Sequence, residues 1–321
     1  MLAFYALREG RLIPLDPKTD SVETATWIDL LNPSVEEEAQ AERLLGVGIP
    51  THEDMVEIEV SSRLYSENDA LYMTANLLVG GHGPMPQSAP VTFILTHRRL
   101  ASVRYAEPSV LRTFVEQAKK ADSSLRDADT IFIALLEAII DRTADILEKV
   151  GVDLDGISVA VFQNEMESKS ASRDYKSLLR RLGRSGDLNS KVRESLVSIG
   201  RLVNFLTAEC GEMHVDLRDR TRTMSADIRS LADHASYLAN TTVFLLDALM
   251  GLINISQNDI IRTVSVVSVL IMPPTLVASI YGMNFRFMPE LGSPFGYPLA
   301  LVAMVAAAAL PYWYFKRRGW L

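Results

Sequence analysis

Two long uncharged stretches dominate the hydrophobic pattern of the chain, and both lie near its C-terminus. The first covers the 23 residues of 263–285, and the second covers the 25 residues of 291–315. As α-helices they would be roughly 34–37 Å long, enough to cross a hydrocarbon core of about 30 Å. We therefore predict two transmembrane helices, at 263–283 and 296–315. The alternative is a pair of buried helices in a large soluble domain, although such helices normally carry polar residues on one face.

Polar residues recur along one side of the first predicted span and of the helix before it. At 100° per residue, eight positions fall within a sector of roughly 100°. This polar stripe consists of Asp247, Asn254, Asn258, Ser265, Ser268, Met272, Thr275 and Ser279. Asn and Asp side chains are expensive in lipid, so the stripe should face a bundle interior or a water-filled path. A coiled-coil seam whose polar residues set the register is the alternative, and several copies packed around the stripe would satisfy both.

The end of the second stretch has the composition of a membrane interface. Tyr312–Tyr314 and Trp320 are aromatic, and Lys316–Arg318 are basic. Aromatic residues at the interface with cations beyond them anchor a span on its cytoplasmic side. With two spans, both chain termini then lie in the cytoplasm and only a short connection lies outside. We expect a multi-pass protein of the cell inner (plasma) membrane, with the lipid bilayer as a partner.

The N-terminal part of the chain has the alternating pattern of strands. A helix should follow the third strand and extend to about Leu45, because Ser34 and Glu37 have the spacing of a capping box. The predicted strands are a pair within Leu2–Leu15, one at Trp27–Leu31, one at Ala70–Val79, and a hairpin at Pro90–Tyr105.

From about Pro108 the pattern predicts helices almost throughout, with breaks near Asp122, Gly151, Gly186 and Gly211. We therefore expect an α/β lobe at 1–120, long cytoplasmic helices including a stalk at 121–260, and a membrane domain at 261–321. The predicted fold class is an α+β cytoplasmic domain, an α/β sandwich lobe plus long helices, joined to a two-helix transmembrane hairpin.

Charge is unevenly divided along the chain, whose formal net charge is −8. From Arg262 onward there are five basic residues and one acidic residue, whereas the first 261 residues carry 27 basic and 39 acidic side chains. An acidic body lacks the cationic surface that phosphate recognition needs, so we exclude nucleic acid as a partner. Cys210 is the single cysteine, which excludes a disulfide scaffold.

The sequence also argues against an enzyme. Its five histidines show no metal-ligand spacing. It contains no phosphate-binding glycine loop, nucleophile elbow or metalloprotease helix. We expect no catalytic residue.

A family resemblance is carried by the residues around the end of the first span. They read Tyr281-Gly282-Met283-Asn284, preceded by Pro273-Pro274-Thr275, and the C-terminal part contains Tyr314-Phe315-Lys316-Arg317. The chain resembles the CorA family of magnesium and cobalt transporters, whose signature is Gly-Met-Asn. The similarity extends over essentially the whole chain, including Trp27-Ile28-Asp29-Leu30, and is most specific near the C-terminus.

The resemblance implies a funnel-shaped homopentamer in which a long stalk helix continues as the pore helix and the second helix surrounds it. It implies that Gly282, Met283 and Asn284 form the selectivity filter, with Asn284 in an external ring that selects the hydrated ion. The transported ion would be Mg²⁺, with Co²⁺ as a further substrate. By register, the pore-lining positions would be members of the polar stripe: Asp247, Asn254, Asn258, Ser265, Met272 and Thr275.

These residue types suit a strongly hydrated ion. Mg²⁺ requires octahedral oxygen ligands at about 2.0–2.1 Å and gives up water reluctantly. A ring of Asn284 amide oxygens would accept hydrogen bonds from its water shell without a strong charge that traps the ion. Met272 and neighbouring apolar side chains would form a constriction that closes by dewetting.

Regulation is a further implication of the resemblance. In the family, acidic residues at protomer boundaries bind Mg²⁺ and hold the closed state. We assign such a role to Asp227 and Asp233 in the stalk, so that falling cytosolic Mg²⁺ shifts the population towards the open state. Their partners on the N-terminal body stay open among Glu53, Asp54, Glu57, Glu59, Glu67 and Asp69.

Two other functions are compatible with parts of the pattern. One is a transporter of Zn²⁺, Ni²⁺ or Co²⁺ with the same fold, although residues 285–290 keep the magnesium-type continuation. The other is a membrane-anchored scaffold or sensor without conduction. The polar stripe argues against the latter, because an anchor gains nothing from polar side chains within its span.

Overall fold

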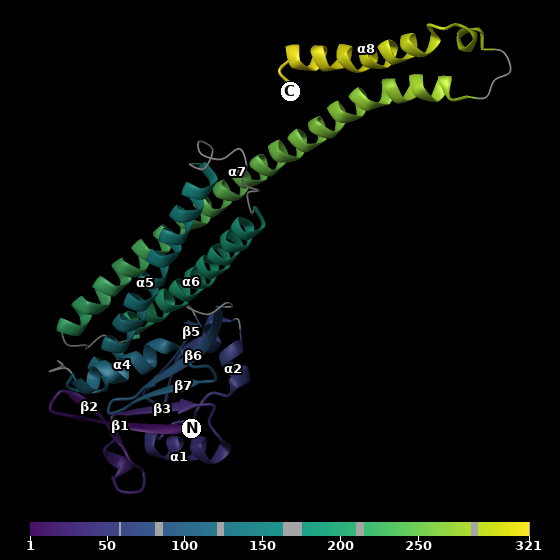
Figure 1. The fold of residues 1–321 in the computed structure, drawn as a ribbon. Coiled ribbons are helices and arrows are strands. Elements are labelled where there is room, and N and C mark those ends of the chain that lie inside the picture. The colour runs from purple at the N-terminus through teal and green to yellow at the C-terminus, as the bar shows by residue number, and fades with distance from the viewer. Residues whose placement is uncertain are drawn as a thin grey trace. The chain divides into compact units, whose positions relative to one another are not determined.

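The computed structural model describes residues 1–57, 59–80, 86–120, 125–162, 175–209, 215–283 and 288–320 (Figure 1). Its contacts group into two units, Met1–Leu246 and Asp247–Leu321. The chain is an α+β protein with two helices that are long and apolar enough to cross a membrane, as the sequence predicted.

The first unit begins with a seven-stranded sheet of order β2-β1-β3-β7-β6-β5-β4. All neighbouring strands are antiparallel except β3 and β7, which are parallel, with Trp27 opposite Leu100. The strands are β1 (Leu2–Arg8), β2 (Arg11–Leu15), β3 (Trp27–Leu31), β4 (Leu64–Glu67), β5 (Ala70–Val79), β6 (Gln87–Leu95) and β7 (Leu100–Arg104). The predicted strands are confirmed, whereas β4 was not predicted.

Helices cover both faces of the sheet, as the alternation along β3 shows. Ile28 and Leu30 belong to a core that also contains Ala41 and Met55, whereas Trp27 meets Phe114 on the opposite face, with ring centroids 5.9 Å apart. The first face is covered by α1 (Val35–Leu45) and α2 (His52–Val56), and the second by α4 (Ser109–Lys120) and α5 (Ala128–Phe162). In a strand that is covered on both faces, consecutive residues are buried rather than every second residue.

The remaining short helices connect these elements. They are the 3₁₀ helix η1 (Val22–Thr24) and α3 (Val60–Arg63). The predicted capping box of α1 is confirmed, because the Ser34 side chain accepts from the Glu37 backbone N–H while the Glu37 carboxylate accepts from the Ser34 N–H. The helices α2 and α3 were not predicted, because four to five residues are too short to show a helical period.

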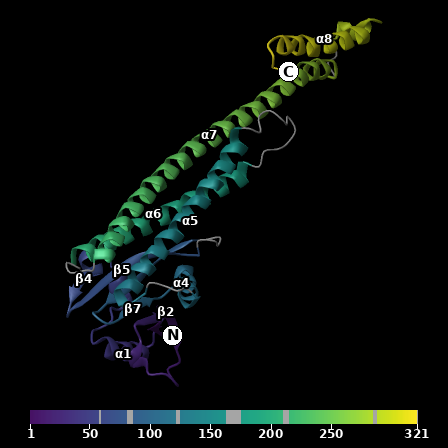
Figure 2. The same cartoon turned by 90° about the vertical axis from the view of Figure 1, so that its left-hand side faces the viewer.

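Three long helices complete the first unit and lie side by side in both views (Figure 2). They are α5, α6 (Tyr175–Glu209) and the N-terminal part of α7 (Val215–Tyr281). Arg220 on α7 holds the Glu137 carboxylate of α5 through two hydrogen bonds of 2.8 and 2.6 Å. The buried Asn189 of α6 donates to the Ala235 carbonyl of α7 at 2.8 Å.

Two of the predicted helix breaks are wrong, since Gly151 lies inside α5 and Gly186 inside α6. The reason at Gly186 is packing. A Cβ there would lie 3.2 Å from Cγ2 of Thr242, so the glycine lets α6 approach α7 closely. The predicted breaks at Asp122 and Gly211 fall outside the described residues, in the intervals between α4 and α5 and between α6 and α7.

A buried ion pair links β3 to β7 within the sheet. Arg104 donates to both carboxylate oxygens of Asp29, at 3.0 and 2.8 Å, and Ser102 donates to the same carboxylate at 2.6 Å. Both charged side chains are 9% exposed. Burial by itself lowers the pKa of Arg104, but the hydrogen bond and the charge of Asp29 outweigh it and leave the pKa raised.

We expect Asp29→Asn to lower the free energy of unfolding by about 3–5 kcal/mol, because it leaves a buried guanidinium without a counter-charge. Glu116→Gln is the matched control. It breaks an exposed pair with Lys119 and should change stability by no more than about 1 kcal/mol. Denaturant unfolding of the purified full-length protein measures the free energy of unfolding of both variants. Equal losses in the two variants would show that the buried ion pair contributes no more to stability than an exposed one.

A second prediction concerns the glycines of α6. Gly186→Ala should lower stability by about 1–3 kcal/mol, because Thr242 cannot rotate freely while its hydroxyl donates to the Leu238 carbonyl at 2.8 Å. Gly183→Ala on the same helix meets nothing within 4 Å and should raise stability by up to about 1 kcal/mol. Thermal unfolding followed by circular dichroism measures the midpoint temperature of both variants. If both substitutions shifted this temperature in the same direction, close packing at Gly186 would be excluded as the cause of its effect on stability.

Candidate functional site

The second unit exposes nearly all of its apolar surface. It consists of the C-terminal part of α7, the 3₁₀ helix η2 (Pro289–Gly292) and α8 (Gly296–Arg317). Among its described residues only Leu249, Val266 and Ala300 are fully buried. In each candidate membrane span only 6% of the most apolar window is buried within the chain. Buried helices of a soluble domain are therefore excluded, and this surface requires lipid or other protein around it.

The predicted pore-lining residues all lie on the uninterrupted helix α7. They share one side of it by register and are exposed: Asp247, Asn254, Asn258, Ser265, Met272 and Thr275. From Asp247 to Thr275 the stripe is about 42 Å long. The chain therefore presents, along one line of a single rigid element, polar groups that continue into its most apolar segment.

Part of the polar stripe lines one groove. Its volume is about 520 Å³, and it is lined by Val267, Ser268, Ile271, Met272, Thr275, Leu276 and Ser279. Met272 and Thr275 therefore line the groove together with two other residues of the polar stripe, Ser268 and Ser279. Asp247, Asn254, Asn258 and Ser265 lie at other levels of the helix and outside the groove.

Two of the three hydroxyl groups that line the groove donate their hydrogens to the backbone of their own helix. Ser268 donates to the Val264 carbonyl and Thr275 to the Ile271 carbonyl, both at 2.8 Å. Each hydroxyl oxygen therefore offers only lone pairs to the outside. Coordinated water around a cation presents only donors, so an acceptor surface of this kind suits a hydrated cation better than an anion.

Two adjacent prolines lie in the same part of α7. Pro273 and Pro274 have no backbone N–H, which removes the donors that the carbonyls of Val269 and Leu270 would meet in a regular α-helix. Such carbonyls must find water or a neighbouring group in a membrane. The prolines thus add acceptors at the level of the groove while the helix continues to Tyr281.

The predicted selectivity filter lies at the end of α7. The Gly282 N–H donates to the Ala278 carbonyl at 2.9 Å, and a Cβ at Gly282 would lie 3.2 Å from that same oxygen. A side chain there would disturb the last turn of the helix. Met283 is 47% exposed. Asn284 lies outside the described residues, so its role stays a prediction.

The proposed regulatory residues are exposed on the part of α7 that belongs to the first unit. Asp227 faces acidic groups of α5. Burial raises the pKa of Asp141, and the negative charges of Glu137, Asp145 and Asp227 raise it further. Within the described ranges, no group of three His, Cys, Asp or Glu side chains could hold a metal ion. Asp227 and Asp233 therefore do not form a closed site within one copy.

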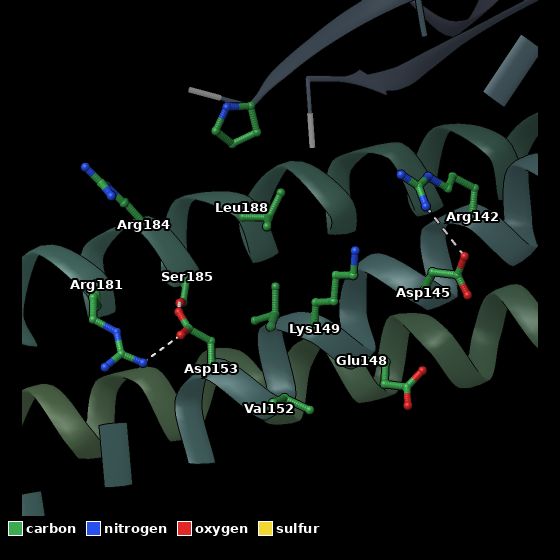
Figure 3. Close-up of a pocket in the computed structure, with 12 residues that line it drawn as sticks. Arg142, Asp145, Glu148, Lys149, Val152, Asp153, Arg181, Arg184, Ser185 and Leu188 are labelled. Atoms are coloured by element: carbon green, nitrogen blue, oxygen red, sulfur yellow. Dashed lines mark hydrogen bonds and ion pairs between the residues drawn. The ribbon is translucent and has the colours of Figure 1, made fainter. Parts of the chain in front are cut away.

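A groove that the sequence did not predict lies between α5 and α6 (Figure 3). Its volume is about 740 Å³. Two of its three carboxylates are neutralised, because Asp153 binds Arg181 and Ser185, each at 2.8 Å, and Asp145 lies 3.6 Å from Arg142. It thus offers few free ligands for a divalent cation. Asp153 and Arg181 are 28 residues apart on different helices, so only the pairing of α5 with α6 reveals them.

Known proteins resemble the whole chain. The family model described as CorA-like Mg²⁺ transporter protein matches residues 22–317. The chain is 35% identical over 322 residues to a magnesium transport protein CorA of Pasteurella multocida, and 34% identical to that of Escherichia coli, with 100% of both partners covered in each comparison.

The fold has a solved counterpart as well. The complete structure of the CorA magnesium transporter from Methanocaldococcus jannaschii superposes with a TM-score of 0.75 at 17% identity, covering 100% of this chain and 99% of that one. The match to the family model and the full-length identity to its members agree with the fold and with the two membrane helices. The chain belongs to the CorA-like Mg²⁺ transporter family.

Proposed function

We propose that this protein conducts Mg²⁺ passively across the inner membrane as a homopentameric channel. The observation that carries the proposal is the polar stripe, with the acceptor-only hydroxyls of Ser268 and Thr275, on a helix whose other sides are apolar and exposed. Five copies that turn this stripe towards a common axis would remove it from lipid and create a path for an ion that keeps its water.

In this arrangement the regions 1–120 and 121–260 lie in the cytoplasm, and 261–321 forms the pore with both termini on the cytoplasmic side. The membrane potential drives uptake, because it contributes about 2.3 kcal/mol per elementary charge per 100 mV, and twice that for a divalent ion. Co²⁺, which also carries a firm octahedral shell, is a further substrate.

We assign selection to Gly282, Met283 and Asn284, and lining of the path to the stripe. Five Asn284 amides would accept hydrogen bonds from the six waters around Mg²⁺. Met272, which is 71% exposed in a single copy, would contribute the apolar constriction. A ring of methionine side chains closes a pore by excluding water rather than by charge.

We base the proposed regulation on Asp227 and Asp233, two exposed acidic residues of α7. Among the described residues, Asp227 and Asp233 find too few carboxylates in their own copy to bind a metal, so a Mg²⁺ ion between copies would need ligands from both. Bound Mg²⁺ would then clamp neighbouring copies together, and its loss would release mutual repulsion among the acidic groups. The pore would open when cytosolic Mg²⁺ falls.

We expect Asn284→Ala to abolish selective Mg²⁺ uptake without affecting assembly, because the amide ring that accepts from coordinated water is lost. Uptake into proteoliposomes, with Co²⁺, Ni²⁺ and Zn²⁺ as competitors, measures this. Asn240→Ala, an exposed position of α7 in the first unit, is the control. Normal Mg²⁺ uptake by Asn284→Ala would exclude Asn284 as the filter, and stronger transport of Zn²⁺ than of Mg²⁺ by the unchanged protein would overturn the proposed substrate.

Neutralising the regulatory pair should weaken closure by Mg²⁺. We expect Asp227→Asn with Asp233→Asn to need a higher Mg²⁺ concentration on the cytoplasmic side for the same inhibition of flux. The control, Asp155→Asn with Glu209→Gln, removes the same charge from exposed positions of α5 and α6. A Mg²⁺ titration of flux distinguishes them, and identical curves for both double variants would place the sensor elsewhere.

A further inference from the structure

Four cations gather at one end of the helix pair of the second unit without an acidic partner. They are Arg262 on α7 and Lys316, Arg317 and Arg318 at the end of α8. In the part of the chain that the structure describes, none of them forms an ion pair with a carboxylate, although eight such pairs occur elsewhere. The carboxylates of residues 1–57, 59–80, 86–120, 125–162, 175–209, 215–283 and 288–320 therefore do not neutralise the positive charge at this end.

Three of these cations fold back onto aromatic rings one helical turn earlier. Lys316 lies 5.9 Å from the centroid of the Tyr312 ring, and the guanidinium groups of Arg317 and Arg318 lie 5.1 and 5.6 Å from those of Trp313 and Tyr314. A cation–π contact stabilises the side chain without cancelling its charge. Because Trp and Tyr rings reside at the level of lipid headgroups, the contacts hold the cations at that level too.

Arg262, the fourth cation, contacts the residues that follow α8 and so connects them to α7. Gly319 has a left-handed φ of 69°, which glycine tolerates best, and it turns the chain back after α8. Trp320 then stacks on Phe315, with centroids 5.5 Å apart, and lies under Arg262 at 5.3 Å. Arg262 also donates to the Gly319 carbonyl. The end of the chain, beside α7 in Figure 1, is thus attached to the helix that carries the polar stripe.

We propose that Lys316, Arg317 and Arg318 form a binding site for the phosphate of an anionic phospholipid, and that the contact of Trp320 with Arg262 transmits its occupancy to α7. Charge complementarity favours an anion, since the three neighbouring cations form no ion pair with a carboxylate of the described residues. The adjoining rings favour a lipid over soluble phosphate: Tyr312, Trp313 and Tyr314 are 47–60% exposed and would contact glycerol and acyl chains. Binding stands on these contacts alone, whereas an effect on flux rests on the proposed channel function.

The binding test uses the full-length protein in phosphatidylcholine vesicles that contain brominated phosphatidylglycerol. Bromine quenches Trp313 and Trp320, so quenching relative to brominated phosphatidylcholine reports the preference for the anionic lipid. We expect the triple variant K316Q/R317Q/R318Q to lose this preference by about tenfold or more, since it removes three cations that attract an anionic headgroup. The charge-keeping variant K316R/R317K/R318K should retain it.

Three results would overturn the binding site. They are equal quenching by both lipids in the unchanged protein, an unaltered preference in the glutamine variant, and displacement of the lipid by inorganic phosphate at low concentration. A preference that weakens with increasing salt would support the Coulombic origin.

The transmission of occupancy is tested with Trp320→Ala. We expect phosphatidylglycerol to change the Mg²⁺ flux of the unchanged protein and not that of the variant, while quenching of Trp313 shows that both bind the lipid. An equal response of both proteins would overturn the role of Trp320. Absence of flux from every protein in every vesicle would refute the channel and leave the binding result valid, so the two failures are distinguishable.

Discussion

The organisation of this protein depends on one constraint: the apolar surface of α7 and α8 cannot be buried within a single chain. Only three described residues of the second unit are fully buried, so lipid and neighbouring protein must cover the rest. A bilayer accepts apolar side chains but not the polar stripe of α7. In the proposed channel, this helix would face lipid on one side and water on the other, and a symmetric assembly around a shared axis would satisfy both demands.

The first unit differs, because its buried and half-buried charged groups need ion-pair and hydrogen-bond partners within the protein. Asp29 and Arg104 are paired across β3 and β7 where the sheet is covered on both faces, and Arg220 joins α7 to α5 through Glu137. Close packing at Gly186 brings α6 against α7. Together these contacts make the N-terminal part of α7 a component of a packed domain. The same helix continues to Tyr281 and carries the polar stripe in the second unit.

The chemistry of a hydrated cation connects the parts of α7. The hydroxyls of Ser268 and Thr275 donate their hydrogens to the backbone of their own helix, and the adjacent prolines remove two backbone donors from it. The surface that results accepts hydrogen bonds and carries no formal charge at the level of the groove. In the proposed channel, this surface would hold the water shell of an ion without holding the ion too tightly to release.

The sequence by itself determined the strands other than β4, the capped helix after Ser34, the two membrane helices and the family. Each of these depends on local periodicity, hydropathy or a short motif. It did not determine the pairing of Asp29 with Arg104, the groove between α5 and α6, or the role of Gly186, which looked like a helix break. Those features join residues far apart in the chain. A glycine's local preference for loops is overridden when a neighbouring helix needs the space of its missing side chain, and only the tertiary structure reveals that neighbour.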